Sequence, residues 1–339
     1  MVHPKFGGYV LGFGIDPAGN EGLLSEYVAL TNGKNFIATE TFDQKTGKIV
    51  KVLAKRNNTS SSYGTWGVFG QHIGLDEYYQ TRKQTFPVLN PLRGNTFNAA
   101  WLLSVQQGYY LSDIEGNFSD SNVVVLTYNS DTDLPTVFAS NIAAGTFGTP
   151  VTINDEEFCF CESPVIALDD QANEAVLASS YSTTPAIAIA DLTSGKVTEF
   201  TGVGYGFVSG IAVDGAKGIA VTTTGGGGFE PAGIQYYDLK KQTGVQYLLP
   251  CSDNGGQNYF PLSVAFDPVH SLFFVEQFDT TRSSGTAIDI YDEKGNLQQM
   301  LTQFAILPVS PTPIALNPKT RTGFVYQDRT AMALQSFGY

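Results

Sequence analysis

The sequence predicts an all-β fold, and three observations support this prediction. Short runs rich in Val, Ile, Tyr and Phe alternate with turns rich in Gly, Asn and Asp, and no segment has the apolar periodicity of a long amphipathic helix. The 339 residues include 36 Gly, 16 Pro, 17 Tyr and 23 Phe, which is typical of many short strands joined by tight turns. Six of the strands end on the same kind of triplet, a small residue, a bulky apolar residue and then Asp or Asn.

The triplets are Gly14-Ile15-Asp16, Gly74-Leu75-Asp76, Ala167-Leu168-Asp169, Ala212-Val213-Asp214, Ala265-Phe266-Asp267 and Ala315-Leu316-Asn317. They recur at intervals of 60, 93, 45, 53 and 50 residues, and recurrence at such periods indicates a repeated sheet unit. We therefore predict a six-bladed β-propeller in which each triplet ends the innermost strand of a blade. The Asp and Asn side chains are expected to cap the turn that follows.

The most regular blade covers residues 163–201. Its four strands are expected at 163–169, 174–179, 186–191 and 196–201. The next two units repeat this order, with strands at 209–214, 218–223, 233–239 and 244–249, and then at 262–267, 271–277, 286–291 and 296–301. Each unit is therefore predicted to be a four-stranded antiparallel sheet with short turns.

The two ends of the chain predict how the ring closes. The first blade has its innermost strand before Asp16 and its outer strand at 47–52. The last blade has strands at 311–317, 322–326 and 331–336, which leaves no room for a fourth strand before the chain ends. We expect residues 2–8 to supply that strand, so that the N-terminal strand pairs with the last blade and removes an exposed sheet edge.

The region 57–154 is less regular. It contains the triplet that ends at Asp76, then an apparent insertion around 77–98 without clear alternation, and then apolar runs at 101–105, 109–112, 122–127 and 135–138. The triplets predict six blades, and a further innermost strand at 101–105 would make seven. No linker rich in Pro, Ser or charge divides the chain, so residues 1–339 are expected to form a single domain.

The charge balance argues against a polyanionic partner. The chain carries 19 Lys and Arg against 32 Asp and Glu, a net charge of −13, whereas nucleic-acid binding requires clustered basic residues. No apolar run reaches the roughly 20 residues that span a bilayer. We therefore expect no nucleic-acid partner and no membrane span.

The expected compartment is the secretory pathway or the extracellular space, with the cytoplasm as the alternative. Asn57, Asn58 and Asn117 each begin a triplet of the glycan-acceptor pattern. Against this, residues 1–5 lack the apolar core of a signal peptide.

The three cysteines leave this question open. Cys159 and Cys161 are two residues apart and would point to the same side of a strand, which makes a bridge between them awkward. A disulfide from Cys251 to either of them, or three thiols, both fit the spacing.

Ligands of a propeller bind at the mouth formed by the loops that enter the innermost strands and the loops that follow the second strands. The residues predicted to bind substrate there are Trp66, Phe69, Gln71, Glu162, Tyr181, Tyr205, Phe207, Asn258, Tyr259, Phe260, Gln277, Phe278 and Gln327. This set is mainly aromatic with a few amides, which suits a flat hydrophobic molecule with polar edges.

Three residues are candidates for catalysis. His72 has the pKa range of a general base, Glu276 could exchange a proton, and Arg329 could polarise a carbonyl oxygen. Each also has a structural interpretation, because a single His is often a hydrogen-bonded core group and charged loop residues are often only solvated.

The sequence lacks the motifs of several kinds of enzyme chemistry. The sequence contains no Gly-x-Ser-x-Gly, His-Glu-x-x-His or Cys-x-x-Cys, and the glycines at 225–228 are not followed by Lys-Ser or Lys-Thr. The glycine run is interpreted as a rim loop. We therefore expect neither a serine triad nor a zinc site, and no cofactor.

At the level of the fold, the repeat resembles the six-bladed propellers of the gluconolactonase, senescence-marker and strictosidine-synthase group. This resemblance implies a metal-dependent lactonase, whose metal is held by Glu, Asn and Asp. Here only Glu162 and Asn258 are of the right type at the expected mouth, and the Pro-Asn-Gly stretch of those lactonases is absent. Lactonase activity is therefore the alternative function.

The acidic chain with an aromatic mouth also resembles fungal natural-product propellers that direct hetero-Diels–Alder cyclisation in tropolone sesquiterpenoid pathways. The resemblance implies a cofactor-free cyclase that binds a hydrophobic polyene or quinone-methide-type intermediate. Such a reaction needs orientation and carbonyl polarisation, and no covalent nucleophile. A cyclase is the function we expect from the sequence, and a non-enzymatic ligand-binding propeller is the second alternative.

Overall fold

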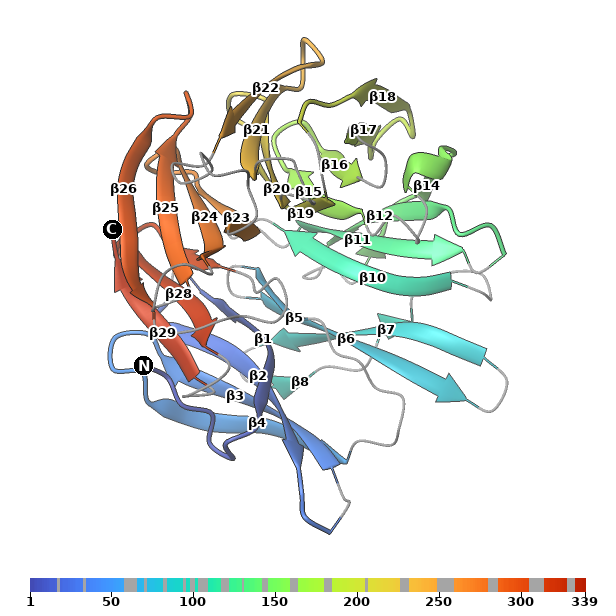
Figure 1. Cartoon of the computed structure of the whole chain (residues 1–339). Helices are drawn as coiled ribbons and strands as arrows, with labels where there is room; N and C mark the ends of the chain where they lie inside the picture. Colours follow the sequence, from blue (N-terminus) through green and yellow to red (C-terminus); the bar gives the residue numbers. More distant parts are fainter. Residues whose placement is uncertain are drawn as a thin grey trace. The chain divides into compact units, whose positions relative to one another are not determined.

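The computed structural model describes residues 1–16, 19–32, 35–57, 66–69, 72–81, 84–93, 96–97, 101–102, 109–116, 122–129, 131–141, 146–158, 164–179, 185–204, 207–225, 232–248, 259–279, 286–304, 314–327 and 333–339. In this part of the chain the fold is all-β, with one 3-10 turn at Glu156–Phe158 and no helix long and apolar enough to cross a membrane. The strands form antiparallel sheets of consecutive strands (Figure 1), as in a β-propeller.

The chain divides into two compact units. Unit 1 comprises Met1–Thr132, Phe138–Gly148 and Ala315–Tyr339, and unit 2 comprises Asp133–Val137 and Thr149–Ile314. The boundary between the units falls within β12 (Pro135–Asn141).

Unit 2 contains three sheets of the predicted four-stranded kind. They are β15 (Val165–Asp169), β16 (Glu174–Ser179), β17 (Ala186–Asp191) and β18 (Val197–Thr201); β19 (Phe207–Asp214), β20 (Ile219–Gly225), β21 (Gly233–Asp238) and β22 (Thr243–Leu248); and β23 (Tyr259–Asp267), β24 (Leu272–Asp279), β25 (Thr286–Asp292) and β26 (Leu297–Phe304). All twelve strands coincide with predicted strands to within a few residues.

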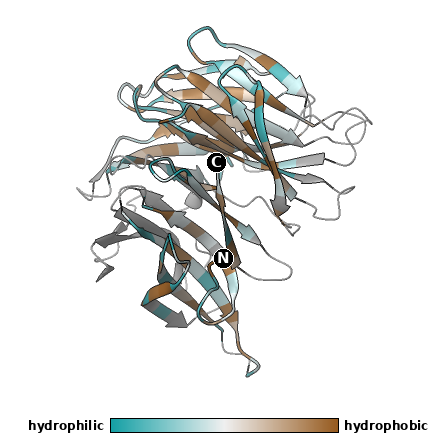
Figure 2. Ribbon diagram, turned by 90° about the vertical axis from the view of Figure 1, so that its left-hand side faces the viewer, coloured by the Kyte–Doolittle hydropathy of each residue, from teal (hydrophilic) through white to brown (hydrophobic). Residues whose placement is uncertain are grey.

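The sheets of unit 2 pack through both faces of their inner strands. Between the first two sheets, Ile187 and Ile189 meet Ala220 and Tyr237, and between the second and third, Val221 and Ile234 meet Phe273 and Val275. Figure 2 shows the hydrophobic segments in the strands and the hydrophilic segments mostly in the connecting turns. Burial of both faces explains why these strands are almost continuously apolar.

Tyrosine hydroxyls add directed links to this packing. The Tyr236 hydroxyl donates to the carbonyl oxygen of Asp292 in the next sheet, at 2.9 Å, and the Tyr237 hydroxyl donates to the carbonyl oxygen of Val203, at 3.2 Å. Burial raises the pKa of both phenols, so both remain donors at physiological pH.

Three of the triplet residues cap turns, as predicted. The Oδ1 atom of Asp169 accepts the amides of Gln171 and Ala172, and Oδ1 of Asp267 accepts those of Val269 and His270. In unit 1, Asn317 Oδ1 accepts the amide of Thr320. The residue four positions after each of these caps has a positive φ, namely Asn173, Ser271 and Arg321, so the three turns share one geometry.

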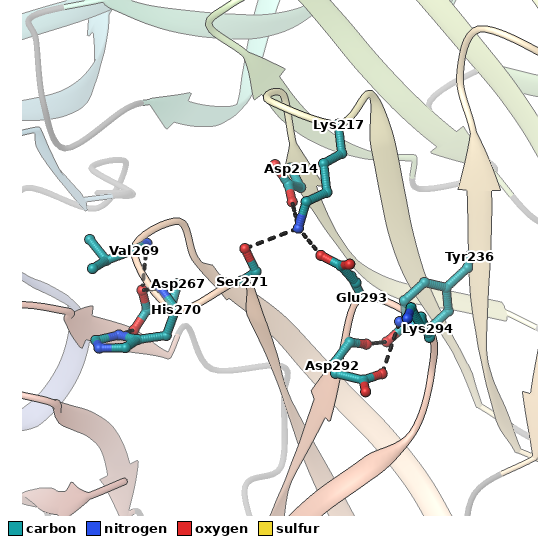
Figure 3. A network of polar contacts seen from close by, with 10 residues as sticks. All are labelled: Asp214, Lys217, Tyr236, Asp267, Val269, His270, Ser271, Asp292, Glu293 and Lys294. Carbon is teal, nitrogen blue, oxygen red and sulfur yellow. Dashed lines mark hydrogen bonds and ion pairs between the residues drawn. The ribbon is translucent and has the colours of Figure 1, made fainter.

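Figure 3 shows that one such turn also joins two sheets of unit 2. Lys217, in the turn after β19, lies 3.6 Å from Asp214 Oδ2, donates to Ser271 Oγ at 3.1 Å and pairs with Glu293. Ser271 and Glu293 belong to turns of the β23–β26 sheet. The network therefore links turns of two neighbouring sheets, the β19–β22 sheet and the β23–β26 sheet.

Unit 1 contains the first sheet, β1 (Tyr9–Ile15), β2 (Glu21–Ala29), β3 (Asn35–Asp43) and β4 (Ile49–Asn57), and the last, β27 (Ala315–Asn317), β28 (Thr322–Gln327) and β29 (Ala333–Gly338). The two share a core in which Phe13, Leu24 and Phe42 meet Phe324 and Leu334. The Phe42 and Phe324 rings pack edge to face at 5.5 Å.

The N-terminal segment pairs with the last sheet, as predicted from the missing fourth strand. The amide of Val2 donates to Leu334 at 2.8 Å, and that of Leu334 donates to Val2 at 2.9 Å. The pairing is a single bridge and not a strand over residues 2–8. Val2 is 1% exposed, so its side chain anchors the segment.

The region 57–154 differs most from the prediction. The described residues of the predicted insertion around 77–98 are strands, because they form the end of β6 (His72–Thr81), β7 (Gln84–Arg93) and β8 (Thr96–Phe97). Pro87 and Pro91 and the mixed composition hide the alternation of β7.

The second triplet is not on a first strand. β6 is the second strand of its sheet, after β5 (Trp66–Phe69), and Asp76 pairs with Leu89 in mid-strand, where it cannot cap a turn. Of the predicted strand at 101–105, the described residues are not an innermost strand either, because β9 (Trp101–Leu102) pairs with β7.

A further sheet follows, formed by β10 (Tyr109–Gly116), β11 (Asn122–Asn129), β12, β13 (Thr146–Phe147) and β14 (Val151–Thr152). The six triplets thus lie in six sheets, as predicted, and this sheet without a triplet is the seventh among the described strands.

Some predictions concern positions that lie outside the described residues. These are the cysteines at 159, 161 and 251, the acceptor sites Asn58 and Asn117, and the glycines at 226–228.

The turns after the third strands predict a response to acid. Asp43, Asp191 and Asp238 accept backbone amides and side-chain hydrogen bonds, which lower their pKa. Stability from a lowered pKa is present above the ordinary value near 3.8 and is lost as the pH falls through the folded value. We expect an NMR titration of Asp191 to have its midpoint below 3.8, and Asp191→Asn to make stability less steeply dependent on pH between 4 and 2. An ordinary midpoint would contradict this.

Candidate functional site

Only three of the predicted site residues have described side chains, Phe207, Glu276 and Gln277. Gln71, Glu162, Tyr181, Tyr205, Asn258 and Arg329 lie outside the described residues. The remaining ones are placed by their backbone alone, at Trp66 and Phe69 in β5, His72 in β6, Tyr259 and Phe260 in β23, Phe278 in β24 and Gln327 in β28.

The sequence predicted loop positions for these residues, although the predicted strand at 271–277 already included Glu276 and Gln277. β19 begins, and β24 ends, two residues beyond the predicted bounds. Glu276 and Gln277 lie inside β24, which continues to Asp279, and Phe207 begins β19. The reason is that the polar ends of these strands still pair with their neighbours, whereas the apolar pattern used for prediction stops earlier. The candidate site is therefore built on strand ends as well as on loops.

Glu276 is buried on one face of β24. It is 1% exposed, and its Oε2 atom accepts a hydrogen bond from the Ser263 hydroxyl at 3.1 Å. Ser263 is the residue of β23 that pairs directly with Glu276. A carboxyl group held beside a hydroxyl in the middle of two paired strands can donate or accept a proton.

Gln277 is buried on the opposite face, because successive side chains of a strand alternate. Its Nε2 atom donates to Asp289 Oδ2 at 2.6 Å, and the Tyr291 hydroxyl donates to the same oxygen at 3.3 Å. This face belongs to the core shared with the β19–β22 sheet. In the described contacts Gln277 thus orders β24 and β25.

The first strands β19 and β23 approach each other closely beside Ser263. The Ser209 hydroxyl donates to the carbonyl oxygen of Pro261 at 2.6 Å and shares a hydrogen bond with Thr223 Oγ1 at 2.9 Å. A Cβ atom on Gly210 would lie 3.0 Å from the amide nitrogen of Val264 and 3.1 Å from Cα of Ser263. Glycine therefore permits this contact between backbones.

A shift of register recurs at this level in four first strands. It lies between Val10 and Gly12, Leu111 and Asp113, Val208 and Gly210, and Pro261 and Ser263. In each strand the residue two positions before the bulged one is aromatic, namely Tyr9, Tyr110, Phe207 and Phe260. Such bulges occur at the rims of barrels and beside active sites, where they redirect side chains.

Two of these aromatic residues have described side chains, and both are exposed. Phe207 is 63% exposed and Tyr9 is 51% exposed. Sequence reasoning selected Phe207 and Phe260 but missed Tyr9, Tyr110, Ser209 and Ser263. The sequence does contain a signal for the four aromatic positions, because each lies seven residues before an Asp or Asn. These Asp and Asn residues are Asp16, Asn117, Asp214 and Asp267.

The described residues contain no group of three or more His, Cys, Asp or Glu side chains that could hold a metal ion. The two ligand-type residues of the lactonase resemblance, Glu162 and Asn258, lie outside the described residues.

Comparison with known proteins supports the fold alone. No protein-family model matches the sequence, and no curated protein matches it significantly. Among solved structures, hydrazine synthase of Kuenenia stuttgartiensis matches with a TM-score of 0.67 at 10% identity, over 100% of this chain and 97% of the other.

Two further matches are propellers by name. The Cps50 (Swd1) β-propeller domain of Myceliophteria thermophila has a TM-score of 0.61 at 10% identity, over 98% of each chain. The β-propeller domain of the trilobed protease of Pyrococcus furiosus has a TM-score of 0.61 at 11% identity, over 98% of this chain and 93% of the other. The chain is therefore a β-propeller, and at these identities the likeness says nothing about its ligand.

The close approach at Gly210 generates a prediction. Gly210→Ala should lower the free energy of unfolding by about 1–3 kcal/mol, because the added methyl group meets backbone atoms that cannot rotate away. Gly148→Ala is the control, since its Cβ would lie 3.4 Å from the Ala139 side chain, an ordinary contact. Urea unfolding measures both variants. Equal stability of the two would show that β19 and β23 do not approach as described.

Proposed function

We propose that this β-propeller binds a hydrophobic small molecule at the end of unit 2 where β19 and β23 begin and β24 ends. Phe207 supports the location, because a phenylalanine that is 63% exposed at the start of a first strand offers an open ring face. Phe260 occupies the same register position in the adjacent first strand. Two aromatic positions at neighbouring strand starts suit a flat ligand.

The buried Glu276–Ser263 pair is the observation that supports a chemical role for this site. The carboxyl group of Glu276 is covered by protein and lies at the same end of the sheet as Phe207 and Phe260. A carboxyl group removed from bulk water interacts more strongly with a developing charge than an exposed one. Glu276 is therefore the residue we propose for proton exchange with, or polarisation of, the bound molecule.

The reaction we propose is a cyclisation of a polyene or quinone-methide-type intermediate, including hetero-Diels–Alder cyclisation. In this reaction two new bonds form between the partners and nothing leaves, so the protein needs to orient both partners and polarise a carbonyl oxygen. Aromatic positions hold the planar partner, and Glu276 acts on its oxygen. His72 and Arg329 keep the roles expected from the sequence, as further candidates for the same polarisation.

Binding without chemistry is the second candidate, and one observation favours it. In other sheets the register position of Glu276 is occupied by Thr223 and Ser25, each in the first pair after the register shift. A polar residue at this position therefore recurs without an acid. The test must separate a structural carboxyl group from a reactive one.

The first test replaces the acid and keeps its shape. With an ortho-quinone-methide precursor and a polyene as substrates, Glu276→Gln should slow product formation by about 100-fold, the usual contribution of a positioned acid or base. Glu199→Gln, a carboxyl group of β18 in the same unit, should leave the rate unchanged. Rate and enantiomeric excess are measured by chiral chromatography.

Three outcomes are distinct. Racemic product formed no faster than in buffer, despite binding of the precursor, would establish the binding-only function. Stoichiometric Ca²⁺ or Zn²⁺ in metal analysis of the purified protein, together with lactone hydrolysis, would establish the lactonase. Absence of any binding would overturn the proposal.

The second test concerns the aromatic position. Phe207→Ala should weaken binding of the quinone-methide precursor about tenfold, or ~1.4 kcal/mol, because the exposed ring no longer stacks on it. Val269→Ala is a matched control, since Val269 is 69% exposed but lies in the turn after β23, at the other end of the sheet. Calorimetric titration compares the two, and equal affinities would remove Phe207 from the site.

A further inference from the structure

The first sheet contains two fully buried carboxyl groups that hold the N-terminal segment. Glu26 on β2 and Glu40 on β3 are both 0% exposed. Glu26 accepts the amides of Phe6 at 2.9 Å and Gly8 at 2.7 Å, and Glu40 Oε2 accepts the amide of Lys5 at 2.9 Å. Three backbone contacts, those of Lys5, Phe6 and Gly8, therefore depend on two acids.

The two acids lie on the same face of the sheet. In the pairing of β2 with β3, Glu26 is opposite Ala38 and Glu40 is opposite Leu24, so the glutamates are diagonal neighbours. The Oε1 atom of Glu40 is buried and has no hydrogen-bond partner among the described residues. Of the two oxygen atoms of Glu40, only Oε2 therefore takes part in the contacts that hold residues 5–8.

The segment held by these acids continues to the last sheet. Phe6 packs edge to face on Phe36 of β3, with ring centroids 5.3 Å apart, and Val2 forms the bridge to Leu334 of β29. A Cβ atom on Gly47 would lie 2.6 Å from the carbonyl oxygen of Met1. Residues 1–8 thus connect the β1–β4 and β27–β29 sheets of unit 1.

In two sheets of unit 2 the same register positions are both polar but carry at most one acid. Positions are compared by counting from the turn between the first and second strands of each sheet. Glu26 then corresponds to Thr224 in the β19–β22 sheet and to Gln277 in the β23–β26 sheet. Glu40 corresponds to Gln235 and to Asp289 in the same two sheets. In both cases the pair is joined directly, by Gln235 Nε2 to Thr224 Oγ1 at 2.6 Å and by Gln277 to Asp289. Two acids cannot make such a bond when both are ionised.

Among the side chains that the structure describes, few cations face the pair. Lys5, on the segment itself, acts on Glu40, and its side chain is exposed. Lys55 of β4 shares the face but lies over aromatic rings, with Nζ 3.8 Å from the Phe36 centroid and 4.9 Å from that of Phe6. His3 and the amino group of Met1 are the other titratable groups of the segment, and both residues are exposed.

We propose that Glu26 and Glu40 form a proton-dependent clamp, which holds residues 5–8 tightly at acidic pH and loosens them as the pH rises toward 8. Loosening the clamp releases the N-terminal segment that also completes the last sheet. The device would couple the pH of the compartment to the connection between the first and last sheets.

The direction follows from the protonation of Glu40. Burial, and next the charge of Glu26, raise the pKa of Glu40 to about 7 from an ordinary 4.5, against the lowering effects of the Lys5 amide and charge. A raised acid pKa means that the closed form binds the proton more tightly than the open form. The clamp is therefore most stable below pH 4.5 and loses stability as the pH rises through 7.

The test is amide hydrogen exchange of residues 5–8 at pH 5 and pH 8, corrected for the intrinsic rate at each pH. If Glu40 returns to its ordinary pKa on opening, the opening equilibrium should increase on the order of 50-fold between these values. Glu40→Gln should reduce the change to less than about threefold, since Gln235 shows that an amide fits this register position.

Controls separate the clamp from other titrations. Glu21→Gln, an exposed carboxyl group on the same strand, and His3→Gln should both keep the full pH dependence. If Glu40→Gln does not fold, Glu26→Gln replaces it and should shrink the change, because the neighbouring charge is removed. Equal protection of the wild type at both pH values, or an unchanged pH dependence in the glutamine variant tested, would overturn the proposal.

Discussion

In the sheets whose burial is described, the second and third strands bury both faces, and this constraint governs the rest of the structure. β16 is apolar almost throughout because Ala, Val and Leu side chains must pack on both sides. The same constraint makes every polar side chain at these positions costly unless it is bonded. The polar pairs Thr224–Gln235 and Gln277–Asp289 meet this requirement within their own sheets.

The first sheet meets the requirement in another way. Its pair consists of Glu26 and Glu40, which accept backbone amides of the N-terminal segment. The two carboxyl groups thus hold the N-terminal segment in place, although burial disfavours their charged form. Among these three sheets, the first is therefore the one whose pair consists of two acids.

Four first strands contain a register shift beside an aromatic position. Each shift begins at the residue that follows an aromatic one. The first cross-strand pair after the shift is a pair such as Ser263–Glu276. Gly210 and Ser209 show how adjacent first strands are held together at this level, by a contact that a methyl group would block and by a hydroxyl bonded to Pro261. Rigid strand ends are better suited than loops to hold a reacting pair in one geometry.

Much of the fold could be read from the sequence, because the strands between Val165 and Phe304 combine strong apolar runs with Asp-capped turns, and these local signals agree. The sequence also indicated the role of Asp169 and Asp267 as caps and the attachment of the N-terminus to the last sheet. The strand nature of Gln84–Arg93, the place of Asp76 in a second strand, and the burial of Glu26, Glu40 and Glu276 were decided only by the tertiary structure. The reason is that turn capping and apolar alternation are local properties of the chain, whereas the partner of a strand and the solvent exposure of a carboxyl group depend on residues distant in the sequence.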